Sequence, residues 1–370
     1  MKISDVSVTL WEWRNIPPTR YTKTVASSKT RSTQMALIKI STDEGVDGYG
    51  FFGSALGSAQ RDAPFIVKGL KPLLIGEDPL ARERIWQAMT RRARGSLLSA
   101  VGSVDVALWD LAGRAAGVPV HQLMGSLRES VPAYASSAVL DSPEAYGEEA
   151  VSFREAGWQA YKIHPPGEPE EDIKICEAVR KAVGDDYRIM LDSTWSYDYP
   201  AALRVGQAAE SLGFYWYEDP LADDDLYGYV KLRSQLGIPI MATELPMALP
   251  TSYAPWIMQQ ATDYLRGDVA IKGGLTSCLK TAHTAETFRM NYEVHHGGNS
   301  FNNHANLHLI AAIQNCEYFE VLLPADAQKH GLVNDIEIDQ DGMVHVPTGP
   351  GIGAEIDFDL IERNKVAVLT

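Results

Sequence analysis

From about Val131 onward, the chain alternates short apolar runs with stretches of helical periodicity. The apolar runs read VPAYASS, WQAYKIH, YRIMLD, FYWYED, PIMATE, DVAI, YEVH and YFEVLL. Segments between them, such as PAALRVGQAAESLG and LTSCLKTAHTAETFRM, are long enough for helices. Strands that alternate with helices pair in parallel and are joined by right-handed crossovers. About eight such strands predict a (β/α) barrel.

A polar residue stands at or near the end of most of these runs. The set recurs at intervals of 24 to 27 residues and consists of Asp192, Glu218, Glu244, Asp268, His295 and Glu320. The carboxyl ends of parallel barrel strands meet at one rim, and barrel enzymes carry their chemistry there. The regular spacing therefore predicts one shared site that contains these side chains.

Three of these acids, Asp192, Glu218 and Glu244, would lie on consecutive strands. Neighbouring carboxylates repel one another and raise their pKa values unless a cation lies between them. All-oxygen ligation suits Mg²⁺, which commonly keeps other positions for water or substrate oxygens. A single acid at a strand end more often pairs with a lysine, but three acids in register predict a site for one Mg²⁺ per chain.

Candidate proton-transfer groups occur on two other parts of the rim. Lys162 and His164 lie two residues apart in YKIH, so both side chains point to the same strand face, here the barrel interior. A buried lysine at this place serves as a base or as an anchor for an anion. On another strand, Asp268 is placed to orient His295 and set its tautomer. His296 points to the opposite face, so we expect His295 to enter the site and keep His296 as the alternative.

The composition argues against several classes of partner. A net charge of −15 disfavours nucleic acid and anionic membranes, which bind cationic surfaces. No apolar run approaches the roughly 18 residues that a membrane span needs. The three cysteines are far apart and form no CxxC pair, which suits small core residues in a reducing compartment. Because the first residues show no basic leader followed by an apolar core, we expect a cytoplasmic protein.

Residues 1–125 have a different pattern. The stretch MALIKISTDEGVDGYG alternates like exposed strands with a turn, and two helical stretches follow at roughly 58–74 and 80–93. A longer apolar stretch, SAVGSVDVALWDLAGRAAGVPVHQLMG, has helical spacing, and Gly117 and Pro119 are expected to end its first helix. The pattern of residues 1–125 therefore predicts an α+β structure.

Taken together, these motifs resemble the mandelate racemase subgroup of the enolase superfamily over nearly the full chain. The likeness rests on the long helical stretch before the barrel, KxH at 162–164, YEDPL at 217–221, DVAIKGG at 268–274 and YFEVL at 318–322, together with Asp192, Glu244 and His295. The resemblance implies a modified (β/α)7β barrel and a cap built from both ends of the chain. We therefore expect an α+β cap at 1–125, the barrel at 126–324 and a segment at 325–370 that completes the cap. It also implies a homo-oligomer.

The resemblance also implies roles for single residues. Asp192, Glu218 and Glu244 match the Mg²⁺ ligands, Asp268 and His295 match an Asp–His dyad, and Glu320 matches an acid that hydrogen-bonds the substrate carboxylate. In the superfamily a base removes the proton α to a carboxylate and the metal stabilises the resulting enediolate, a scheme that belongs to the superfamily itself. Two departures matter, because His164 replaces a usual second lysine and Thr194 replaces a frequent asparagine. Lys162, His164 and His295 therefore all stay open as the base.

Dehydration of acid sugars is the commonest outcome in this subgroup, so we expect a carbon–oxygen lyase. After the α-proton leaves, loss of a β-hydroxyl gives a 2-keto-3-deoxy acid. Two proton-transfer groups on opposite faces also permit racemisation, epimerisation or lactone cycloisomerisation at the same site. An alternative from another class is a catalytically silent ligand-binding homologue, and the complete acid triad argues against it.

Substrate selection is expected in the cap. Residues 13–42 contain no acid but include the basic residues Arg14, Arg20, Lys23, Lys29, Arg31 and Lys39. This stretch matches in position a cap loop that closes over the substrate, so Arg20 and Tyr21 are substrate-binding candidates; the alternative is a solvated loop whose charge is accidental. Residues 50–60 would form a second loop with small side chains. On the barrel side, His296 and Asn299 complete the candidates for binding a small-molecule carboxylate.

Overall fold

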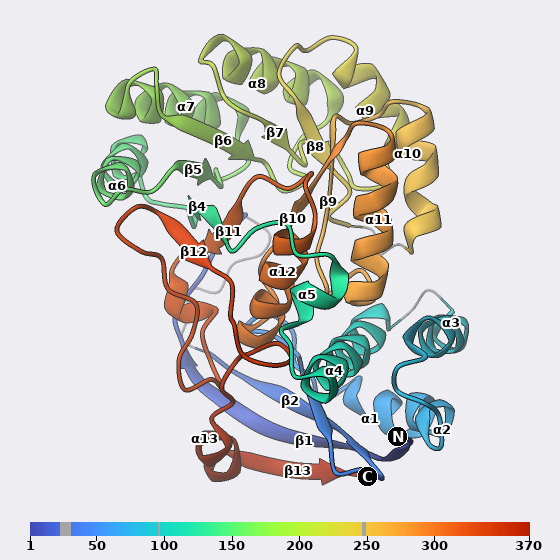
Figure 1. The fold of residues 1–370 in the computed structure, drawn as a ribbon. Helices are drawn as coiled ribbons and strands as arrows, with labels where there is room; N and C mark the ends of the chain where they lie inside the picture. Colours follow the sequence, from blue (N-terminus) through green and yellow to red (C-terminus); the bar gives the residue numbers. More distant parts are fainter. Residues whose placement is uncertain (23–30, 95–96, 246–248) are drawn as a thin grey trace.

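The computed structural model of the 370-residue chain describes residues 1–22, 31–94, 97–245 and 249–370. Figure 1 shows an antiparallel sheet at one end of the molecule and a group of parallel strands surrounded by helices at the other. Within the described part of the chain, none of the helices has the length and apolar character that crossing a membrane requires.

The barrel consists of eight parallel strands in the described residues. They are β4 (Ser130–Ser136), β5 (Ala160–Ile163), β6 (Arg188–Asp192), β7 (Tyr217–Glu218), β8 (Ile240–Ala242), β9 (Tyr264–Gly267), β10 (Asn291–Val294) and β11 (Phe319–Leu322). Hydrogen bonds connect them in the order β10-β9-β8-β7-β6-β5-β4-β11, which gives a nearly closed barrel. The short strand β12 (Met343–His345) pairs with β4 in the antiparallel direction.

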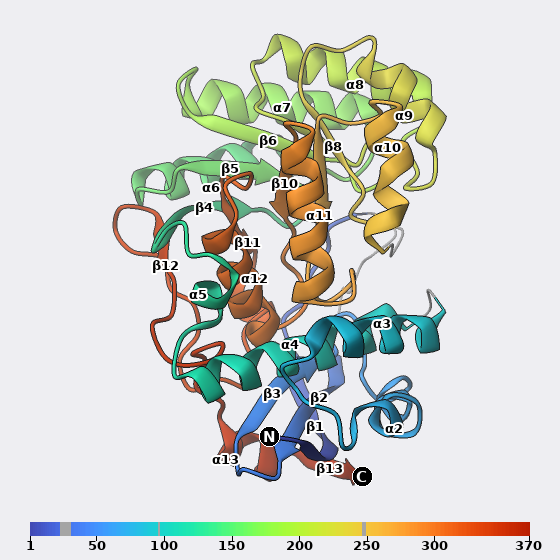
Figure 2. The same ribbon diagram turned by 45° about the vertical axis from the view of Figure 1, so that its right-hand side comes forward.

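Seven helices connect these strands. They are α6 (Pro143–Glu155), α7 (Pro169–Val183), α8 (Tyr199–Ser211), α9 (Leu226–Arg233), α10 (Ala254–Met258, preceded by the 3-10 turn η2, Pro250–Tyr253), α11 (Leu275–Thr287) and α12 (Ser300–Ala312). Figures 1 and 2 agree that α7, α8 and α11 lie on the outside of the strands. Four helices begin at polar residues whose side chains accept a backbone N–H of the first turn, namely Ser142, Asp198, Asp225 and Asn299. Seven βα units followed by a final strand confirm the predicted (β/α)7β barrel.

The cap is an α+β structure, as predicted. Its sheet has the order β13-β1-β2-β3, with β1 (Ile3–Ile16), β2 (Arg31–Thr42), β3 (Asp47–Phe52) and β13 (Lys365–Leu369). Its helical segments are α1 (Ala63–Phe65), η1 (Ile66–Leu70), α2 (Lys71–Leu74), α3 (Arg82–Ala93), α4 (Leu98–Ala116) and α5 (Val120–Met124). Near the C-terminus follow the turn η3 (Ala325–Ala327) and α13 (Phe358–Arg363). Because β13 pairs antiparallel with β1, residues from both ends of the chain share one sheet; the domain boundaries after residues 125 and 324 stay predictions.

Two predicted strands differ from the structure. The run FYWYED contains the two-residue strand β7, although the Tyr215 N–H still donates to the Ile189 carbonyl at 2.8 Å. The prediction of a strand at DVAI was wrong, because β9 ends at Gly267 and Asp268 follows it. The charged Arg266 lies inside β9 and interrupts the apolar run, so the pattern placed the strand too late.

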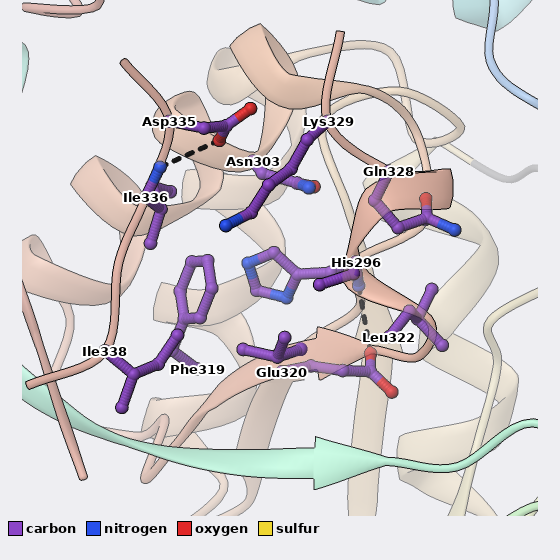
Figure 3. A pocket seen from close by; sticks show the side chains of 13 residues that line it. His296, Asn303, Phe319, Glu320, Leu322, Gln328, Lys329, Asp335, Ile336 and Ile338 are labelled. Atoms are coloured by element: carbon purple, nitrogen blue, oxygen red, sulfur yellow. Dashed lines mark hydrogen bonds between the residues drawn. The ribbon is translucent and has the colours of Figure 1, made fainter. Parts of the chain in front are cut away.

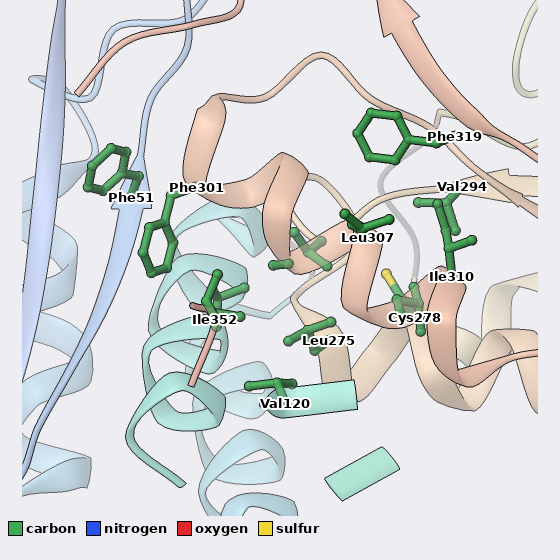
Figure 4. Close-up of a cluster of buried hydrophobic side chains, with 14 of the residues drawn as sticks. Phe51, Val120, Leu275, Cys278, Val294, Phe301, Leu307, Ile310, Phe319 and Ile352 are labelled. Atoms are coloured by element: carbon green, nitrogen blue, oxygen red, sulfur yellow. The ribbon is translucent and has the colours of Figure 1, made fainter. Parts of the chain in front are cut away.

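A shared hydrophobic core joins the cap to the barrel. Figure 4 shows Phe51 of β3 facing Phe301 of α12, and their ring centroids lie 5.1 Å apart. Val120 of α5 and Ile352 belong to the same buried cluster. Full burial of a large apolar side chain contributes about 1.5–3 kcal/mol, so these contacts hold the cap on the barrel.

Helix α4 approaches the barrel rim closely at Gly102. A Cβ atom at this position would lie 2.4 Å from the Val269 carbonyl oxygen. Val269 directly follows Asp268, so the absence of a side chain at Gly102 lets α4 support the segment that carries this acid.

Candidate active site

A pocket of about 190 Å³ lies at the carboxyl ends of the barrel strands, beside the cap. Its lining includes the acids Asp192, Glu244 and Glu320, the cation Lys162 and the imidazoles His164 and His295. The structure therefore brings together six of the eight residues predicted to bind the metal or to take part in catalysis. The other two, Glu218 and Asp268, lie directly behind the lining and contact it.

The acid triad is built by three neighbouring strands. Asp192 and Glu218 are the last residues of β6 and β7 and pair in register, and Glu244 lies two residues beyond β8. One carboxylate oxygen from each residue lies within 4.8 Å of the others. The Asp192 and Glu218 side chains are buried, whereas 15% of the Glu244 side chain is exposed to the pocket. Three hard oxygen donors with one accessible side fit a divalent cation such as Mg²⁺.

The backbone around the triad is unusual. Thr194, Asp219 and Thr243 have φ values of 44°, 42° and 83°, a region that residues other than glycine rarely occupy. Each lies within two residues of a triad acid, and the Lys272 ammonium donates to the Thr243 carbonyl at 2.6 Å. Such strain persists where surrounding contacts over-determine it and clusters at functional sites.

Lys162 of β5 lies among the acids. Its Nζ is 2.9 Å from Asp192 Oδ2, 3.0 Å from Glu218 Oε2 and 2.7 Å from Glu320 Oε1. Burial opposes a charge on this lysine, yet the three carboxylates outweigh burial and raise the pKa of Lys162 well above its ordinary value. Lys162 is therefore a firmly held cation.

The two neighbouring acids of the triad differ in how readily they ionise. Burial opposes ionisation of Asp192, but Lys162 and His164 hold the pKa of this carboxyl well below its usual range. For Glu218 burial prevails, and together with the neighbouring Asp192 carboxylate it raises the pKa. A cation bound between these acids would favour the ionised form of Glu218, because an opposite charge lowers the pKa of a carboxyl group.

His164 faces the pocket from the lysine side. Its Nδ1 lies 2.7 Å from the Ser137 carbonyl, which can only accept, so Nδ1 carries a proton. Its Nε2 lies 3.0 Å from Asp192 Oδ2. The Tyr21 ring packs against the imidazole with centroids 5.2 Å apart.

His295 faces the pocket from the other end of the triad. Its Nδ1 contacts Asp268 Oδ2, and its Nε2 lies 3.4 Å from Glu244 Oε1. Asp268 is itself fixed, because Oδ1 accepts the N–H groups of Ala270 and Ile271 at 2.6 and 3.0 Å. Burial disfavours the imidazolium, but Glu244 and Asp268 overcome this and raise the pKa of His295 to about 9.

Glu320 is the second residue of β11, deeper in the barrel than a strand-end position. Its carboxylate contacts Lys162 through one oxygen and Arg266 through the other, the latter at 2.6 Å. Although burial opposes ionisation, Arg266 and Lys162 hold the pKa of Glu320 well below its usual range.

The sequence patterns missed Arg266, which is fully buried in β9. Its Nε contacts Glu218 Oε1, and its Nη2 lies 2.6 Å from Glu320 Oε2. Side chains along a strand alternate between two faces, so a residue two positions before Asp268 points to the same face as Asp268. This alternation is the sequence signal that could have identified Arg266. The same reasoning had identified Lys162 beside His164. The lining also includes Leu56, which lies in the predicted second cap loop at 50–60, and Trp195 and Gln328, which no pattern singled out.

The candidate substrate-binding residues differ in where they lie relative to the pocket. Tyr21 lines the pocket, and its hydroxyl donates to the Leu323 carbonyl at 2.8 Å. Arg20 directly precedes it, and the Arg20 carbonyl accepts the Val139 N–H at 2.7 Å. Asn299 instead begins α12 and donates through Nδ2 to the Gly53 carbonyl at 2.9 Å, so its side chain ties the barrel to the cap.

His296 lies behind Glu320 and faces a separate, small cavity of about 30 Å³ (Figure 3). Its ring packs on Phe319 with centroids 4.1 Å apart, and its backbone N–H donates to Glu320 Oε2 at 3.0 Å. Neither ring nitrogen has a hydrogen-bond partner among the residues that the structure describes. The side chain thus points away from the pocket that holds the triad, as the alternation along the strand predicts.

Two residues of the cationic stretch of the cap pair with acids of the cap itself. Arg14 pairs with Glu12 at 2.6 Å, and Lys39 pairs with Asp47 at 2.8 Å. Lys23 and Lys29 lie outside the described residues.

Comparisons with known proteins agree with this geometry. The model for the mandelate racemase/muconate lactonizing enzyme N-terminal domain matches residues 8–125, and the enolase C-terminal domain-like model matches residues 145–360. D-galactarolactone cycloisomerase of Agrobacterium fabrum is 29% identical over 99% of both chains. Arabinonate dehydratase of Saccharolobus solfataricus is 29% identical over 90% of this chain and 91% of its own.

A solved structure gives the same result in three dimensions. D-glucarate dehydratase from Agrobacterium tumefaciens, complexed with magnesium, superimposes with a TM-score of 0.89 and 35% sequence identity. The match covers 99% of this chain and 100% of that chain. The fold, the acid triad and these matches lead to one conclusion: the chain belongs to the mandelate racemase/muconate lactonizing enzyme family of the enolase superfamily.

Proposed function

We propose that this protein is a Mg²⁺-dependent dehydratase of an acid sugar, a carbon–oxygen lyase. One observation carries the proposal: two imidazoles flank the acid triad, with His164 3.0 Å from Asp192 and His295 3.4 Å from Glu244. Removing an α-proton and expelling a β-hydroxyl requires one proton acceptor and one proton donor beside the same carboxylate site. Relatives that act on arabinonate, D-xylonate and L-talarate or galactarate support this substrate class.

Asp192, Glu218 and Glu244 would hold the metal, because they offer oxygen donors that lie within 4.8 Å of one another. Bound there, Mg²⁺ would supply Lewis-acid stabilisation of the negative charge that develops on the substrate carboxylate. Lys162 and Glu320 line the same pocket. As a fixed cation, Lys162 attracts the carboxylate group and orients it beside the triad.

His164 is the proposed base. Because Nδ1–H donates to the Ser137 carbonyl, Nε2 is the ring nitrogen that exchanges a proton at the pocket, and it acts as a base in the neutral ring, when it does not donate to Asp192. Nε2 takes the proton from the carbon α to the carboxylate. Lys162 does not take this role, because three carboxylates keep it charged.

His295 is the proposed acid. Asp268 and Glu244 favour its protonated form, and its Nε2 points to the triad from the side opposite His164 in strand order. As the C–O bond breaks, Nε2 donates its proton to the departing β-hydroxyl, which leaves as water. The enol that remains tautomerises to the 2-keto-3-deoxy acid.

A second candidate is a cycloisomerase or epimerase that uses the same pair of imidazoles. The full-length similarity to D-galactarolactone cycloisomerase favours keeping this possibility. A catalytically silent homologue is the least consistent with a complete triad and two proton-transfer groups. We also propose a cytoplasmic homo-oligomer, to be checked by light scattering of the purified protein and by cell fractionation.

Proton NMR in D₂O with Mg²⁺ and a library of aldonic, uronic and aldaric acids tests the proposal. A new 3-deoxy methylene signal identifies a dehydratase and its substrate. Exchange of the α-proton without elimination indicates an epimerase instead. If no acid in the library reacts while lactones do, the dehydratase proposal fails and the cycloisomerase takes its place.

A further inference from the structure

Four buried charged residues form a closed ring of ion pairs beneath the pocket. We call the set Lys162, Glu218, Arg266 and Glu320 the ion-pair ring. Lys162 Nζ contacts Glu218 Oε2 at 3.0 Å and Glu320 Oε1 at 2.7 Å. Arg266 contacts the other oxygen of each acid, Glu218 Oε1 through Nε and Glu320 Oε2 through Nη2 at 2.6 Å. Each carboxylate therefore binds one lysine and one arginine, and each cation bridges both acids.

All four side chains of the ring are fully buried. Removing one member of a buried charge network leaves its partners uncompensated, which is strongly destabilising. The ring also fixes the positions of the two carboxylates relative to each other. Arg266 determines their orientation, because its planar guanidinium presents several donors at set angles, whereas Lys162 presents a single point charge. Arg266 is held in turn by the Tyr134 hydroxyl, 3.3 Å from Nη2.

The ring links two parts of the site that have different tasks. Glu218 belongs to the acid triad on one side, and Glu320 faces the pocket on the other. Arg266 itself is not among the described residues that line the pocket. Its direct contacts in the site are with the acids that it holds, so it positions these acids and does not touch the substrate.

We propose that Arg266 is a positioning residue that fixes Glu218 for metal binding and Glu320 for substrate binding in one arrangement. The inference rests on the proposed function for its consequences in catalysis, but its effect on the metal site can be measured without substrate. The ring also sets the charge of the site. Lys162 and Arg266 balance two of the four carboxylates of Asp192, Glu218, Glu244 and Glu320, and one divalent cation balances the remaining two.

The test compares Arg266→Lys with the wild-type protein. Lysine keeps the charge but places all its donors on one nitrogen, whereas Arg266 contacts the two acids through the separate atoms Nε and Nη2, so the change removes this two-point geometry. Removing an outer partner of a metal ligand typically weakens metal affinity by about tenfold to a hundredfold. We expect the Kd for Mg²⁺, measured by calorimetry, to rise at least about tenfold while the circular dichroism spectrum stays native.

The matched control is Arg233→Lys. Arg233 on α9 also holds one acid through two nitrogens, Asp263 at 2.9 and 2.7 Å, and Asp263 directly precedes β9, at the opposite end of the barrel from the pocket. This variant is expected to keep the wild-type Kd for Mg²⁺. At saturating Mg²⁺, Arg266→Lys should keep a kcat at least about tenfold below that of the control, because Glu320 is displaced as well.

A folded Arg266→Lys protein whose Kd stays within about twofold of wild type overturns the inference. If this variant does not fold, Tyr134→Phe decides, because it removes only the hydroxyl that holds Arg266. A native Tyr134→Phe protein with an unchanged Kd and kcat then overturns the inference, and a several-fold weaker Kd supports it. If the wild type binds Mg²⁺ but turns over no acid sugar, the proposed function fails. Comparison of the Kd for Mg²⁺ between the wild type and Arg266→Lys still tests the positioning role of Arg266.

Discussion

Replacing Asp268 with asparagine tests whether this acid makes His295 a proton donor. Burial is the largest influence on His295 and lowers its pKa, Arg266 lowers it further, and Glu244 and Asp268 raise it to about 9. Because burial outweighs Glu244, loss of the Asp268 carboxylate leaves a net lowering. We therefore expect the pKa of His295 to fall from about 9 to below its ordinary value of 6.5 in the Asp268→Asn variant.

The size of the effect follows from these values. A fall from about 9 to 6.5 corresponds to about 3 kcal/mol of lost preference for the imidazolium. At pH 8, roughly 90% of His295 is protonated in the wild type and about 3% or less in the variant. The assay is an NMR titration of the histidine ring protons in metal-free protein. A pKa that stays near 9 in Asp268→Asn would refute the reasoning.

The same pair contributes to stability with a defined sign. The pKa of His295 is higher in the folded protein than its ordinary value of 6.5, so its contribution is fully present below pH 6.5. It is lost as the pH rises through about 9. Asp268→Asn should therefore lower the melting temperature more at pH 6 than at pH 10. As a control, Asp339→Asn changes the exposed Asp339–His345 pair, 2.7 Å apart, and should leave the melting temperature nearly unchanged.

Three further predictions concern the metal, the chemistry and the fold. Asp192→Asn should abolish tight binding of one divalent ion per chain, as measured by metal analysis after EDTA treatment and reloading; retention of the ion would contradict the assignment of the triad. In D₂O, His295→Asn should still exchange the substrate α-proton but fail to eliminate, whereas His164→Asn should lose both reactions; exchange by His164→Asn would move the base to another residue. Gly102→Ala should lower the free energy of unfolding by about 1–3 kcal/mol in urea titrations, because the added methyl group meets the Val269 carbonyl; an unchanged value would mean that α4 shifts freely.

The alternation of apolar runs with helical stretches predicted the barrel, and the regular spacing of polar residues predicted that the triad acids lie on one rim. Parallel strands end at one rim, so the chain distance between Asp192, Glu218 and Glu244 translates directly into spatial proximity. The two-residue spacing of Lys162 and His164 likewise predicted a common direction, and both line the pocket. These inferences succeed because strand geometry fixes where side chains point.

The patterns failed where a residue breaks the usual rule for its element. Arg266 places a charge inside the buried strand β9, so the next apolar run, DVAI, resembles a strand more than YLRG does. Its partners lie on β7 and β11, far away in sequence, so the residues around Arg266 do not indicate that an acid compensates its charge. Asn299 illustrates the opposite case, because a polar residue near the site can be explained by capping a helix.

The pairing of β1 with β13 has a consequence for synthesis of the chain. Val8 pairs with Leu369, so one edge of β1 can be covered only after residue 369 has been made. At about 5–20 residues per second, the interval between the two strands lasts roughly 20 to 70 seconds. During this time an apolar strand edge is open to other chains, and edges of this kind promote aggregation. Nascent chains stalled before residue 365 should therefore associate with chaperones more than chains in which residues 365–369 have been made.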